Sequence, residues 1–227
     1  MNLAIIPARI GSKRIPKKNV KDFCGKPIIA WSIEEAIKSS CFDRIIVSTD
    51  CEDLAEIAIF YGAEVPFIRP SELANDYADT TSVVKHGINF FINQKIIFDN
   101  VCCIYATAPF LQSSDLKKGL ALLNNKEVSY SMPVTSYRFP IQRAIKINAN
   151  NRVEMFNRKN FKKRSQDFTE AWHDAGQFYW GRADAWLNDK LIFDIETSPI
   201  ILPSYRVQDI DTPEDWKRAE KLFKNMK

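Results

Sequence analysis

The loop after the first predicted strand carries the residues best suited to bind a polyphosphate. An apolar run over 3–8 predicts a buried strand, and 9–26 then holds seven lysines or arginines and one acid, Asp22. Gly11 and Ser12 stand where the backbone must turn tightly. Backbone amides, a hydroxyl and several cations in one short loop favour an anionic ligand. The alternative is a solvated basic loop after an edge strand.

This loop matches neither common phosphate-binding fingerprint. It has no G-x-x-x-x-G-K-[ST], and the glycine that follows Gly11 is Gly25, so no G-x-G-x-x-G exists. ATPase and dinucleotide-binding interpretations therefore lose their support. What remains is a cation-rich loop at the carboxyl end of a strand, the edge at which open α/β sheets bind ligands.

A pair of acids, Asp209 and Asp211, precedes a helix predicted to begin at Thr212 and Pro213. In a strand, residues i and i+2 share one face, so both carboxylates point into the same space. Paired carboxylates suit magnesium bound to phosphates, although surface acids also commonly precede helices. Together with the basic loop, the pair predicts a site for a nucleoside triphosphate with its metal, and hence nucleotidyl transfer.

Three further segments carry polar groups at predicted strand ends. The segment 69–76 is dense in hydrogen-bonding groups, but it is equally well read as a capped helix entry leading to Thr80. Residues 105–109 end a central strand and so lie on the same ligand edge as the basic loop. Asp50 ends its own strand, and its simplest role is a helix cap.

Composition narrows the class of protein. A chain of 227 residues with 45% hydrophobic content can bury a substantial core. The net charge of +4 is mild, and its basic residues concentrate at 9–26 and 152–164, which favours local anion binding over nucleic-acid binding. No window approaches the roughly 18 to 20 apolar residues of a membrane helix, and the N-terminus lacks a signal-peptide layout. We expect a cytoplasmic protein without membrane contact.

Cysteine and histidine usage excludes other chemistries. The five cysteines are odd in number and form no C-x-x-C pair, so neither a disulfide framework nor a zinc site is supported. The two histidines, His86 and His173, exclude a multi-histidine metal centre. His173 lies beside Asp174, but no nucleophile elbow accompanies it, so we expect a binding or structural histidine.

Strand and helix patterns alternate through the first 125 residues, which predicts an α/β fold with a mostly parallel sheet. Strands are expected at 3–8, 44–48, 64–68, 101–105, 128–133 and from 177. Helices are expected after Pro27, around 54–61, around 84–91 and from 213, the last with Trp216, Ala219, Phe223 and Met226 on one face.

The segment 137–168 interrupts this regularity. It is polar, basic and turn-rich, with a hairpin turn expected at 148–151. We predict an arm that leaves the core and packs on a partner subunit. The alternative is a mobile surface insertion.

Four motifs, in order and at compatible spacing, resemble those of the sugar-acid cytidylyltransferases, which make CMP-sialic acid and its relatives. The first is A-R-x-G-S-K-R-I-P-x-K-N at 8–19, followed by C-F-D-R-I-I-V-S-T-D at 41–50, R-P-x-E-L-A-x-D at 69–76 and D-I-D-T at 209–212. The resemblance implies a Rossmann-like nucleotidyltransferase domain over 1–227, with a mixed central sheet and a small dimerisation arm at 137–168. It also implies a homodimer in which the partner's arm completes the sugar pocket.

The activity that the resemblance implies is attack of the sugar's anomeric 2-hydroxyl on the α-phosphorus of CTP, with release of pyrophosphate. Such transfer depends on positioning and charge neutralisation more than on a reactive side chain. The implied CTP contacts come from Ala8, Arg9, Gly11, Ser12, Lys13, Lys18, Asn19, Arg69, Ala78 and Thr80. Among these, Lys13 and Lys18 would offset transition-state charge, while Asp209 and Asp211 would hold Mg²⁺. No dedicated general base is evident.

The sequence departs from the sialic acid synthetases on the sugar side. Those enzymes usually carry a glutamine and an arginine around their T-[SA]-P motif, where this chain has Tyr105 and Leu111, and they place an arginine at the position of His173. With the segments 139–143 and 164–167, these changes resemble the pseudaminic acid branch, whose sugar carries two acylamino groups and a deoxy carbon. The sugar-side candidates are Tyr105, Gln142, Arg164, Gln166, His173 and Tyr179.

Three alternatives remain. The same chemistry could act on N-acetylneuraminic or legionaminic acid. A noncatalytic nucleotide-binding or RNA-contacting protein could use the same basic loop, but the acid pair would then lack a purpose. A nucleotidyltransferase for an ordinary sugar phosphate is disfavoured by the motif spacing.

Overall fold

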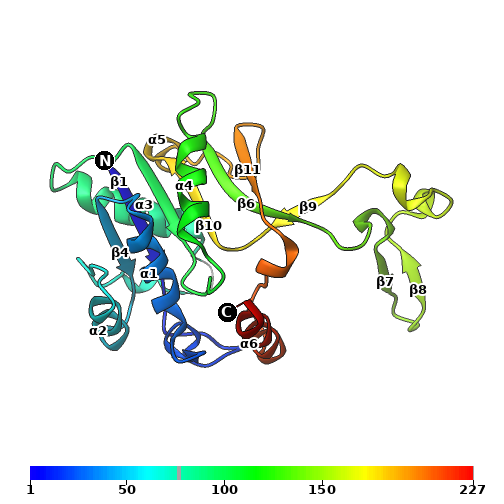
Figure 1. Cartoon of the computed structure of the whole chain (residues 1–227), viewed down its shortest axis with the longest axis horizontal. Helices are drawn as coiled ribbons and strands as arrows, with labels where there is room; N and C mark the ends of the chain where they lie inside the picture. Colours follow the sequence, from blue (N-terminus) through cyan, green and yellow to red (C-terminus); the bar gives the residue numbers. More distant parts are fainter. Residues whose placement is uncertain (76–77, 227) are drawn as a thin grey trace.

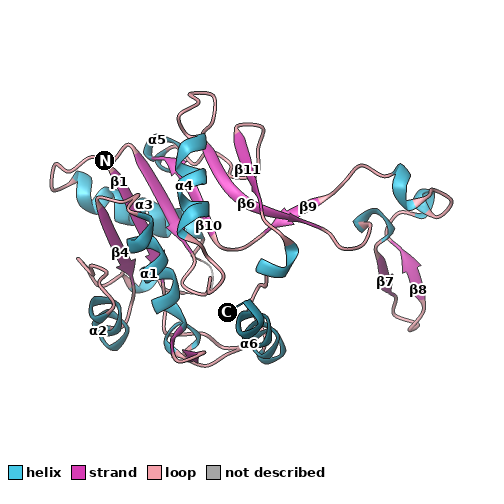
Figure 2. Ribbon diagram, viewed as in Figure 1, coloured by secondary structure: helices cyan, strands magenta, loops and turns pink. Residues whose placement is uncertain are grey.

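A seven-stranded mixed sheet forms the centre of the computed structural model, which describes residues 1–75 and 78–226 (Figures 1 and 2). Asp76, at the end of the predicted 69–76 segment, lies outside the described residues. Along the sheet the strands run in the order β11 (Thr197–Ile201), β6 (Tyr130–Ser136), β10 (Phe178–Arg182), β5 (Asn100–Ile104), β1 (Asn2–Pro7) and β4 (Arg44–Ser48), and β9 (Trp172–Asp174) pairs with β6.

The predicted α/β class with a mostly parallel sheet is confirmed. β1 is parallel to β4 and β5, and β11 is parallel to β6, whereas β10 runs antiparallel to both β5 and β6. Because β10 is antiparallel to both of its neighbours, β5 and β6 run in the same direction. The carboxyl ends of β1, β4, β5, β6 and β11 therefore share one edge, where ligands bind in folds of this kind.

Helices cover both faces of the sheet. On one face lie α1 (Ile28–Ser39), α2 (Glu52–Phe60) and α4 (Ser113–Leu122), and on the other lie α3 (Thr80–Ile92) and α5 (Ala183–Leu187). Successive residues of β1 serve opposite cores: Ala4 and Ile6 pack under α1, while Leu3 and Ile5 pack with Phe91. A strand buried on both faces reads as a continuous apolar run, which explains the run at 3–8.

A third buried cluster fixes the site segments to each other. The C-terminal helix α6 (Pro213–Met226) packs Trp216 against Phe23 of the short hairpin β2 (Asp22–Phe23) and β3 (Lys26–Pro27), with ring centroids 5.4 Å apart. Ile15 from the basic loop and Ile210 from between the two acids lie in the same cluster. Met226 is 38% exposed and does not share the buried face that Trp216, Ala219 and Phe223 form.

Two predicted strands differ from the observed ones. The segment 64–68 forms no strand and meets the sheet only at the isolated bridges Ile46–Glu64 and Thr49–Ile68. Pro66 lies between those bridges and has no amide hydrogen to donate to a ladder. The strand predicted at 128–133 begins later, at Tyr130, because the Val128 amide is used in a turn to the Asn125 carbonyl.

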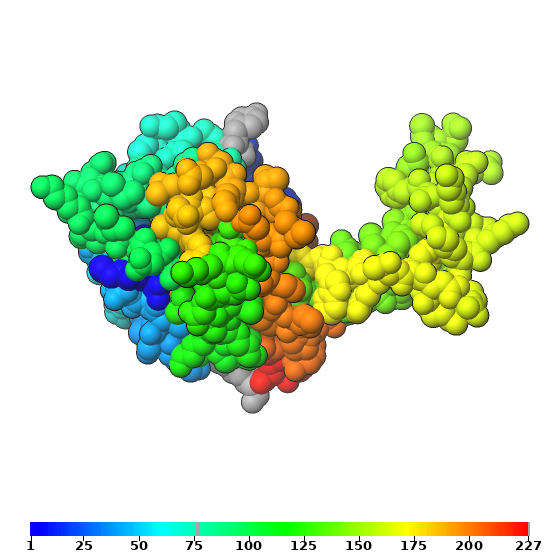
Figure 3. Space-filling view, turned by 90° about the horizontal axis from the view of Figure 1, so that it is seen from above, coloured from blue at the N-terminus to red at the C-terminus, as the bar shows by residue number. Residues whose placement is uncertain are grey.

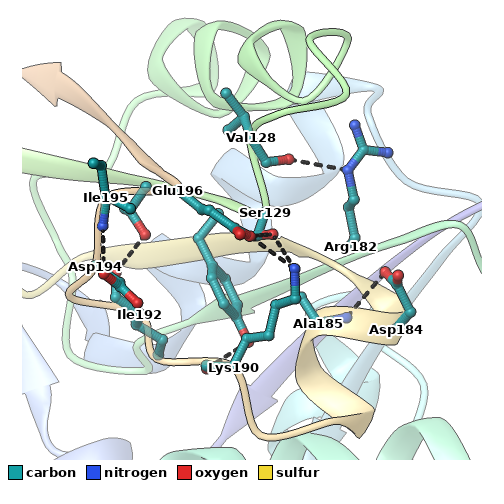
Figure 4. A network of polar contacts seen from close by, with 12 residues as sticks. Val128, Ser129, Arg182, Asp184, Ala185, Lys190, Ile192, Asp194, Ile195 and Glu196 are labelled. Atoms are coloured by element: carbon teal, nitrogen blue, oxygen red, sulfur yellow. Dashed lines mark hydrogen bonds and ion pairs between the residues drawn. The ribbon is translucent and has the colours of Figure 1, made fainter.

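Polar contacts hold the end of β6 that lies opposite the shared carboxyl edge (Figure 4). Lys190 Nζ lies 2.7 Å from Glu196 and 3.1 Å from Ser129 Oγ, and Arg182 Nε donates to the Val128 carbonyl at 2.9 Å. The hydrogen bond from Lys190 lowers the pKa of the Glu196 carboxyl. These contacts link the ends of β6, β10 and β11 on the side of the sheet away from the ligand edge.

Residues 137–171 leave the body between β6 and β9 as an arm (Figures 1 and 3). Its hairpin consists of β7 (Ile145–Ile147) and β8 (Val153–Met155), and the predicted turn at 148–151 is confirmed: Asn148 Oδ1 accepts from the Arg152 amide at 3.0 Å. Figure 3 shows the arm standing away from the body, where it presents exposed apolar side chains: Phe139, Ile147, Val153, Phe156 and Phe161.

The cysteines are free thiols, as expected. Cys102 and Cys103, neighbours on β5, are buried in opposite cores. No helix within residues 1–75 and 78–226 has the length and apolar character that a membrane crossing requires.

Candidate active site

Two cavities open at the shared carboxyl edge, and Tyr105 lines both of them. The smaller, here the loop cavity, has a volume of about 260 Å³, and its walls include Arg9, Lys18, Asn19, Arg69, Asn75, Ala78, Asp79 and Thr80. The larger, here the arm-side cavity, has a volume of about 750 Å³, and its walls include Thr135, Ser136, Arg138, His173, Asp174, Gln208, Asp209 and Arg218.

The basic loop is held in shape by contacts of its own backbone. The Ile10 amide donates to Asp50 Oδ1 at 3.1 Å, and Asn19 Nδ2 donates to the Arg9 carbonyl at 2.9 Å. The suggested helix-cap role of Asp50 is wrong, because α2 begins at Glu52 and the Asp50 carboxylate is aimed at the loop instead. Asp50 thus positions the predicted phosphate-binding backbone.

The tip of the loop is open. The Ser12 amide turns inward and donates to the Ile10 carbonyl at 2.9 Å. Gly11 is exposed, and a Cβ built on it would meet no atom within 4 Å. Lys13 is exposed at this tip and lines neither cavity, in contrast to Arg9 and Lys18. Of the predicted triphosphate contacts, Arg9 and Lys18 thus line a cavity wall, whereas Lys13 lies on the exposed rim of the loop.

Lys18 brings the basic loop against the acid pair, as predicted. Its Nζ donates to the Ile210 carbonyl at 2.7 Å and lies 3.4 Å from Asp211 Oδ1. Arg14 also reaches Asp211, at 3.0 Å. The motif comparison did not assign Arg14, although it belongs to the same basic run.

The two acids lie in a loop rather than in a strand. Ile210 between them is only 1% exposed because it packs in the third cluster. Asp209 lines the arm-side cavity, and Asp211 contacts Arg14 and Lys18. Partial burial, followed by the charge of Asp211, raises the pKa of the Asp209 carboxyl. The described residues contain no cluster of three or more metal-ligating side chains, so a metal here would depend on these two carboxylates together with phosphates and water.

Arg69 is a buried cation aimed into the loop cavity. The residue is 5% exposed, its amide donates to the Thr49 carbonyl at 2.7 Å, and its Nε has no hydrogen-bond partner within the described part of the chain. Burial lowers the pKa of its guanidinium, against the opposing effect of Asp50. A buried donor without a partner is rare in folded proteins and points to a ligand that satisfies it.

In the described residues, the segment that follows Arg69 both caps the start of α3 and lines the loop cavity. Asp79 caps α3 by accepting from the Ser82 amide at 2.6 Å, and Asn75 Oδ1 accepts from the Ala78 amide at 3.0 Å. Ala78 and Thr80 nevertheless line the loop cavity. The cap and the cavity wall are built from the same turn.

Tyr105 is fixed at the end of β5. Its amide donates to the Gln177 carbonyl at 2.9 Å, and Ser32 Oγ donates to its carbonyl at 2.7 Å. Its hydroxyl lies 3.2 Å from that of Tyr179, which in turn donates to the Asp174 carboxylate. Burial raises the pKa of Tyr105 to about 12 and also raises that of Tyr179, so both remain protonated at neutral pH.

A sequence model of the cytidylyltransferase family matches residues 3–225. The chain belongs to the cytidylyltransferase family. It is 48% identical to a pseudaminic acid cytidylyltransferase of Campylobacter jejuni, over 98% of this chain and 96% of the relative. It is 33% identical to a CMP-N,N'-diacetyllegionaminic acid synthase of Legionella pneumophila, over 97% of this chain and 95% of the relative.

A solved structure shares the fold of this cytidylyltransferase. The structure of a CMP:2-keto-3-deoxy-manno-octonic acid synthetase complexed with CTP superposes with a TM-score of 0.70 at 18% identity, over 100% of this chain and 99% of the other. The family match shows that the protein is a nucleotidyltransferase, and the superposition shows the fold that it shares.

The predicted sugar-side residues of this cytidylyltransferase fall into three groups. Tyr105 and His173 line the arm-side cavity, and Tyr179 is 4% exposed behind Tyr105 and lines neither cavity. Gln142, Arg164 and Gln166 lie on the arm instead, where Gln142 donates to the Thr169 carbonyl at 2.7 Å and Arg164 pairs with Asp167 at 3.0 Å. Within one chain, the arm candidates therefore stay outside both cavities.

Sequence reasoning missed several polar residues of the arm-side cavity, among them Arg138, Gln208 and Arg218. Arg138 lies at the start of the arm, just after β6, whereas Gln208 lies in the loop after β11 and Arg218 on helix α6, so no local motif unites them. Arg218 lies one turn from Glu214, which it contacts at 3.2 Å, and this spacing is typical of an ordinary helix-surface pair. Only the folded topology brings these residues to one wall.

Proposed function

We propose that this cytidylyltransferase transfers CMP from CTP to the anomeric 2-hydroxyl of a nonulosonic acid, pseudaminic acid, and releases pyrophosphate. The observation that carries the proposal is the pair of cavities that share Tyr105, one lined by cations from the basic loop and the other lined by Asp209 of the acid pair. A nucleotide in the first and a sugar acid in the second would bring the reacting atoms together at their common wall.

CTP would occupy the loop cavity. Arg9 and Lys18 supply positive charge for the phosphates, Asn19 lies beside them for the ribose, and the unpartnered Nε of buried Arg69 suits an acceptor on cytosine. Fixed cations stabilise the charge that builds on the departing pyrophosphate, which is the main demand of phosphoryl transfer. Lys13 on the open rim would act only on the outer phosphates.

Asp209 and Asp211 would hold Mg²⁺, which supplies positive charge that lowers the pKa of the attacking hydroxyl. Two carboxylates suit this ion, because Mg²⁺ keeps several waters and shares substrate phosphates. Burial is the main cause of the raised pKa of Asp209, and the charge of Asp211 adds to it; a divalent cation between the two carboxylates would offset that second effect, which supports the assignment. Asp211 contacts Lys18 and Arg14, so both cations would lie near the phosphates that share the metal.

The sugar acid would occupy the arm-side cavity. Its volume of about 750 Å³ and its polar wall, with Arg138 and Arg218, suit a large hydroxylated anion. Identity of 48% with a relative named for pseudaminic acid favours that substrate over legionaminic acid, for which the identity is 33%. N-acetylneuraminic and legionaminic acids remain the alternatives.

The arm would contact a second copy of the chain in a homodimer. Its exposed apolar residues, such as Phe139 at 81% and Phe156 at 70%, form a surface typical of an interaction site. Docking of the arm on a partner would also carry Gln142, Arg164 and Gln166 toward the partner's sugar pocket. Because the reaction consumes CTP, we propose that it takes place in the cytoplasm.

The test is incubation of the protein with CTP, Mg²⁺ and pseudaminic acid, followed by measurement of pyrophosphate and mass spectrometry of the sugar product. We expect stoichiometric pyrophosphate and CMP-sugar, with little turnover when UTP or GTP replaces CTP. Binding of CTP without pyrophosphate release from any nonulosonic acid would favour a noncatalytic nucleotide-binding protein instead.

A further inference from the structure

A chain of hydroxyl groups ends at the carboxylate of Asp174. One oxygen of Asp174 accepts from the Gly176 amide at 2.8 Å, and the other accepts from the Tyr179 hydroxyl. A phenol has a single hydrogen, so Tyr179 has none left for Tyr105. The 3.2 Å contact between the two hydroxyls then requires Tyr105 to donate and Tyr179 to accept.

This direction limits what the Tyr105 hydroxyl can offer to a ligand. Once the hydrogen of Tyr105 is committed to Tyr179, its oxygen presents only acceptor lone pairs to other groups. Because Tyr105 lines both cavities, this acceptor oxygen is available to a ligand bound at their shared wall.

We infer that Asp174 is a positioning residue that makes the Tyr105 hydroxyl an obligate hydrogen-bond acceptor, so that Tyr105 selects a sugar acid bearing a donor there, such as an acylamino N–H. This inference rests on the proposed function of the arm-side cavity.

The turn at Gly176 helps to fix the direction of the hydrogen bonds from Tyr105 through Tyr179 to Asp174. Gly176 has φ +63°, a left-handed conformation that side chains disfavour, and this lets its amide fold back onto Asp174. The rings of Tyr105 and Tyr179 meet edge to face at 89°, with centroids 5.6 Å apart. Because burial keeps both phenols protonated at neutral pH, the hydrogens of the chain stay in place.

Substitution Asp174→Asn tests the inference with little change of shape. The Gly176 amide still requires an oxygen at its position, so the new NH₂ group faces Tyr179 and donates to it. Tyr179 then donates to Tyr105, and the hydrogen of Tyr105 turns toward the ligand. Two donors would face each other, so we expect the KM for pseudaminic acid to rise by roughly tenfold or more, with the KM for CTP unchanged.

The decisive comparison adds Tyr105→Phe and the double variant. Without the Tyr105 hydroxyl there is nothing for Asp174 to orient, so Asp174→Asn should add no further loss to Tyr105→Phe. A merely structural role of Asp174 predicts the same loss in both backgrounds, together with an altered KM for CTP, and that result would overturn the inference. An unchanged sugar KM in Asp174→Asn would overturn it as well.

Tyr179→Phe gives an independent check should Asp174→Asn fail to fold. It leaves Asp174 in place but frees the hydrogen of Tyr105, so the sugar KM should again rise while the KM for CTP stays constant; an unchanged sugar KM would contradict the inference. Failure of the proposed function is distinguishable, because the unsubstituted protein would then release no pyrophosphate with any sugar acid. Failure of the inference alone leaves that protein active.

Discussion

Lys18 Nζ and Asp211 Oδ1 lie 3.4 Å apart and join segments from near the two ends of the chain. The same ammonium group donates to the Ile210 carbonyl at 2.7 Å, so its position does not depend on the carboxylate alone. Lys18 also lines the loop cavity. A single cation thus faces both the proposed triphosphate and the proposed metal ligands.

Lys18→Met should lower kcat/KM for CTP by about 10²- to 10³-fold, the usual cost of removing one fixed group that stabilises transition-state charge. Pyrophosphate release at varied CTP concentration measures it. Lys21→Met is the matched control: Lys21 lies over the Trp216 ring at 4.6 Å and outside both cavities, so its activity should stay near normal. Equal losses in the two variants would contradict the assigned role of Lys18.

Arg69→Lys should raise the KM for CTP by roughly tenfold, because an ammonium group does not reproduce the planar donors of a buried guanidinium. Arg44→Lys is a suitable control, since Arg44 on β4 pairs with Glu64 away from both cavities. Binding of CTP by calorimetry separates the effect from turnover. An unchanged CTP affinity in Arg69→Lys would remove Arg69 from the nucleotide site.

Asp209→Asn should raise the Tm of the metal-free protein at pH 7. A carboxyl whose pKa is raised in the folded state destabilises that state when ionised, and the penalty disappears as pH falls through the raised pKa. The gain in Tm should therefore shrink at acidic pH. Scanning calorimetry at several pH values measures the trend.

In the presence of Mg²⁺ the unsubstituted protein should have a higher Tm than Asp209→Asn. The ion relieves the repulsion between the two carboxylates only where both are present. We expect Mg²⁺ to raise the Tm of the unsubstituted protein more than that of Asp209→Asn. Asp211→Asn offers a contrast, since it loses the contacts with Arg14 and Lys18 and should not gain stability in the metal-free form. Identical Mg²⁺ responses in all three proteins would contradict the metal assignment.

Charged residues on the arm should dissociate the proposed dimer. Ile147 and Val153 are directly paired across the β7–β8 hairpin and are 70% and 69% exposed, so Ile147→Asp with Val153→Asp places two charges on one apolar face. Sedimentation velocity should then report monomers with lost turnover. Phe60→Asp, on α2 and 82% exposed, is the control that should leave the dimer intact. A dimer that persists in the arm variant would place the interface elsewhere.

Local residue types predicted those parts of the site that one segment builds. The basic loop and the acid pair were recognisable because cations after a strand and acids before a helix are local patterns, and buried Ile210 preserves the alternation that the prediction required. The predicted strand at 64–68 failed because Pro66 interrupts it. The apolar residues of this segment indicate that it is buried, but they do not show whether its backbone pairs with a neighbouring strand.

The parts that several segments build were not predictable. The sequence predicts that Asp50 caps a helix, yet its carboxylate accepts a hydrogen bond from the Ile10 amide, 40 positions away in the sequence. Tyr179 was assigned to the sugar, yet it lies behind Tyr105, because the turn at Gly176 sets the order of the hydroxyl chain. Contacts of this kind depend on topology and on the direction of hydrogen bonds, which residue spacing does not encode.

The most direct test of the account is the kcat/KM of CTP-dependent pyrophosphate release, measured with Mg²⁺ and with pseudaminic, legionaminic and N-acetylneuraminic acids in parallel. We predict the highest value for pseudaminic acid. Equal or better use of N-acetylneuraminic acid would contradict the assigned substrate, and the absence of release with all three would contradict the proposed reaction itself.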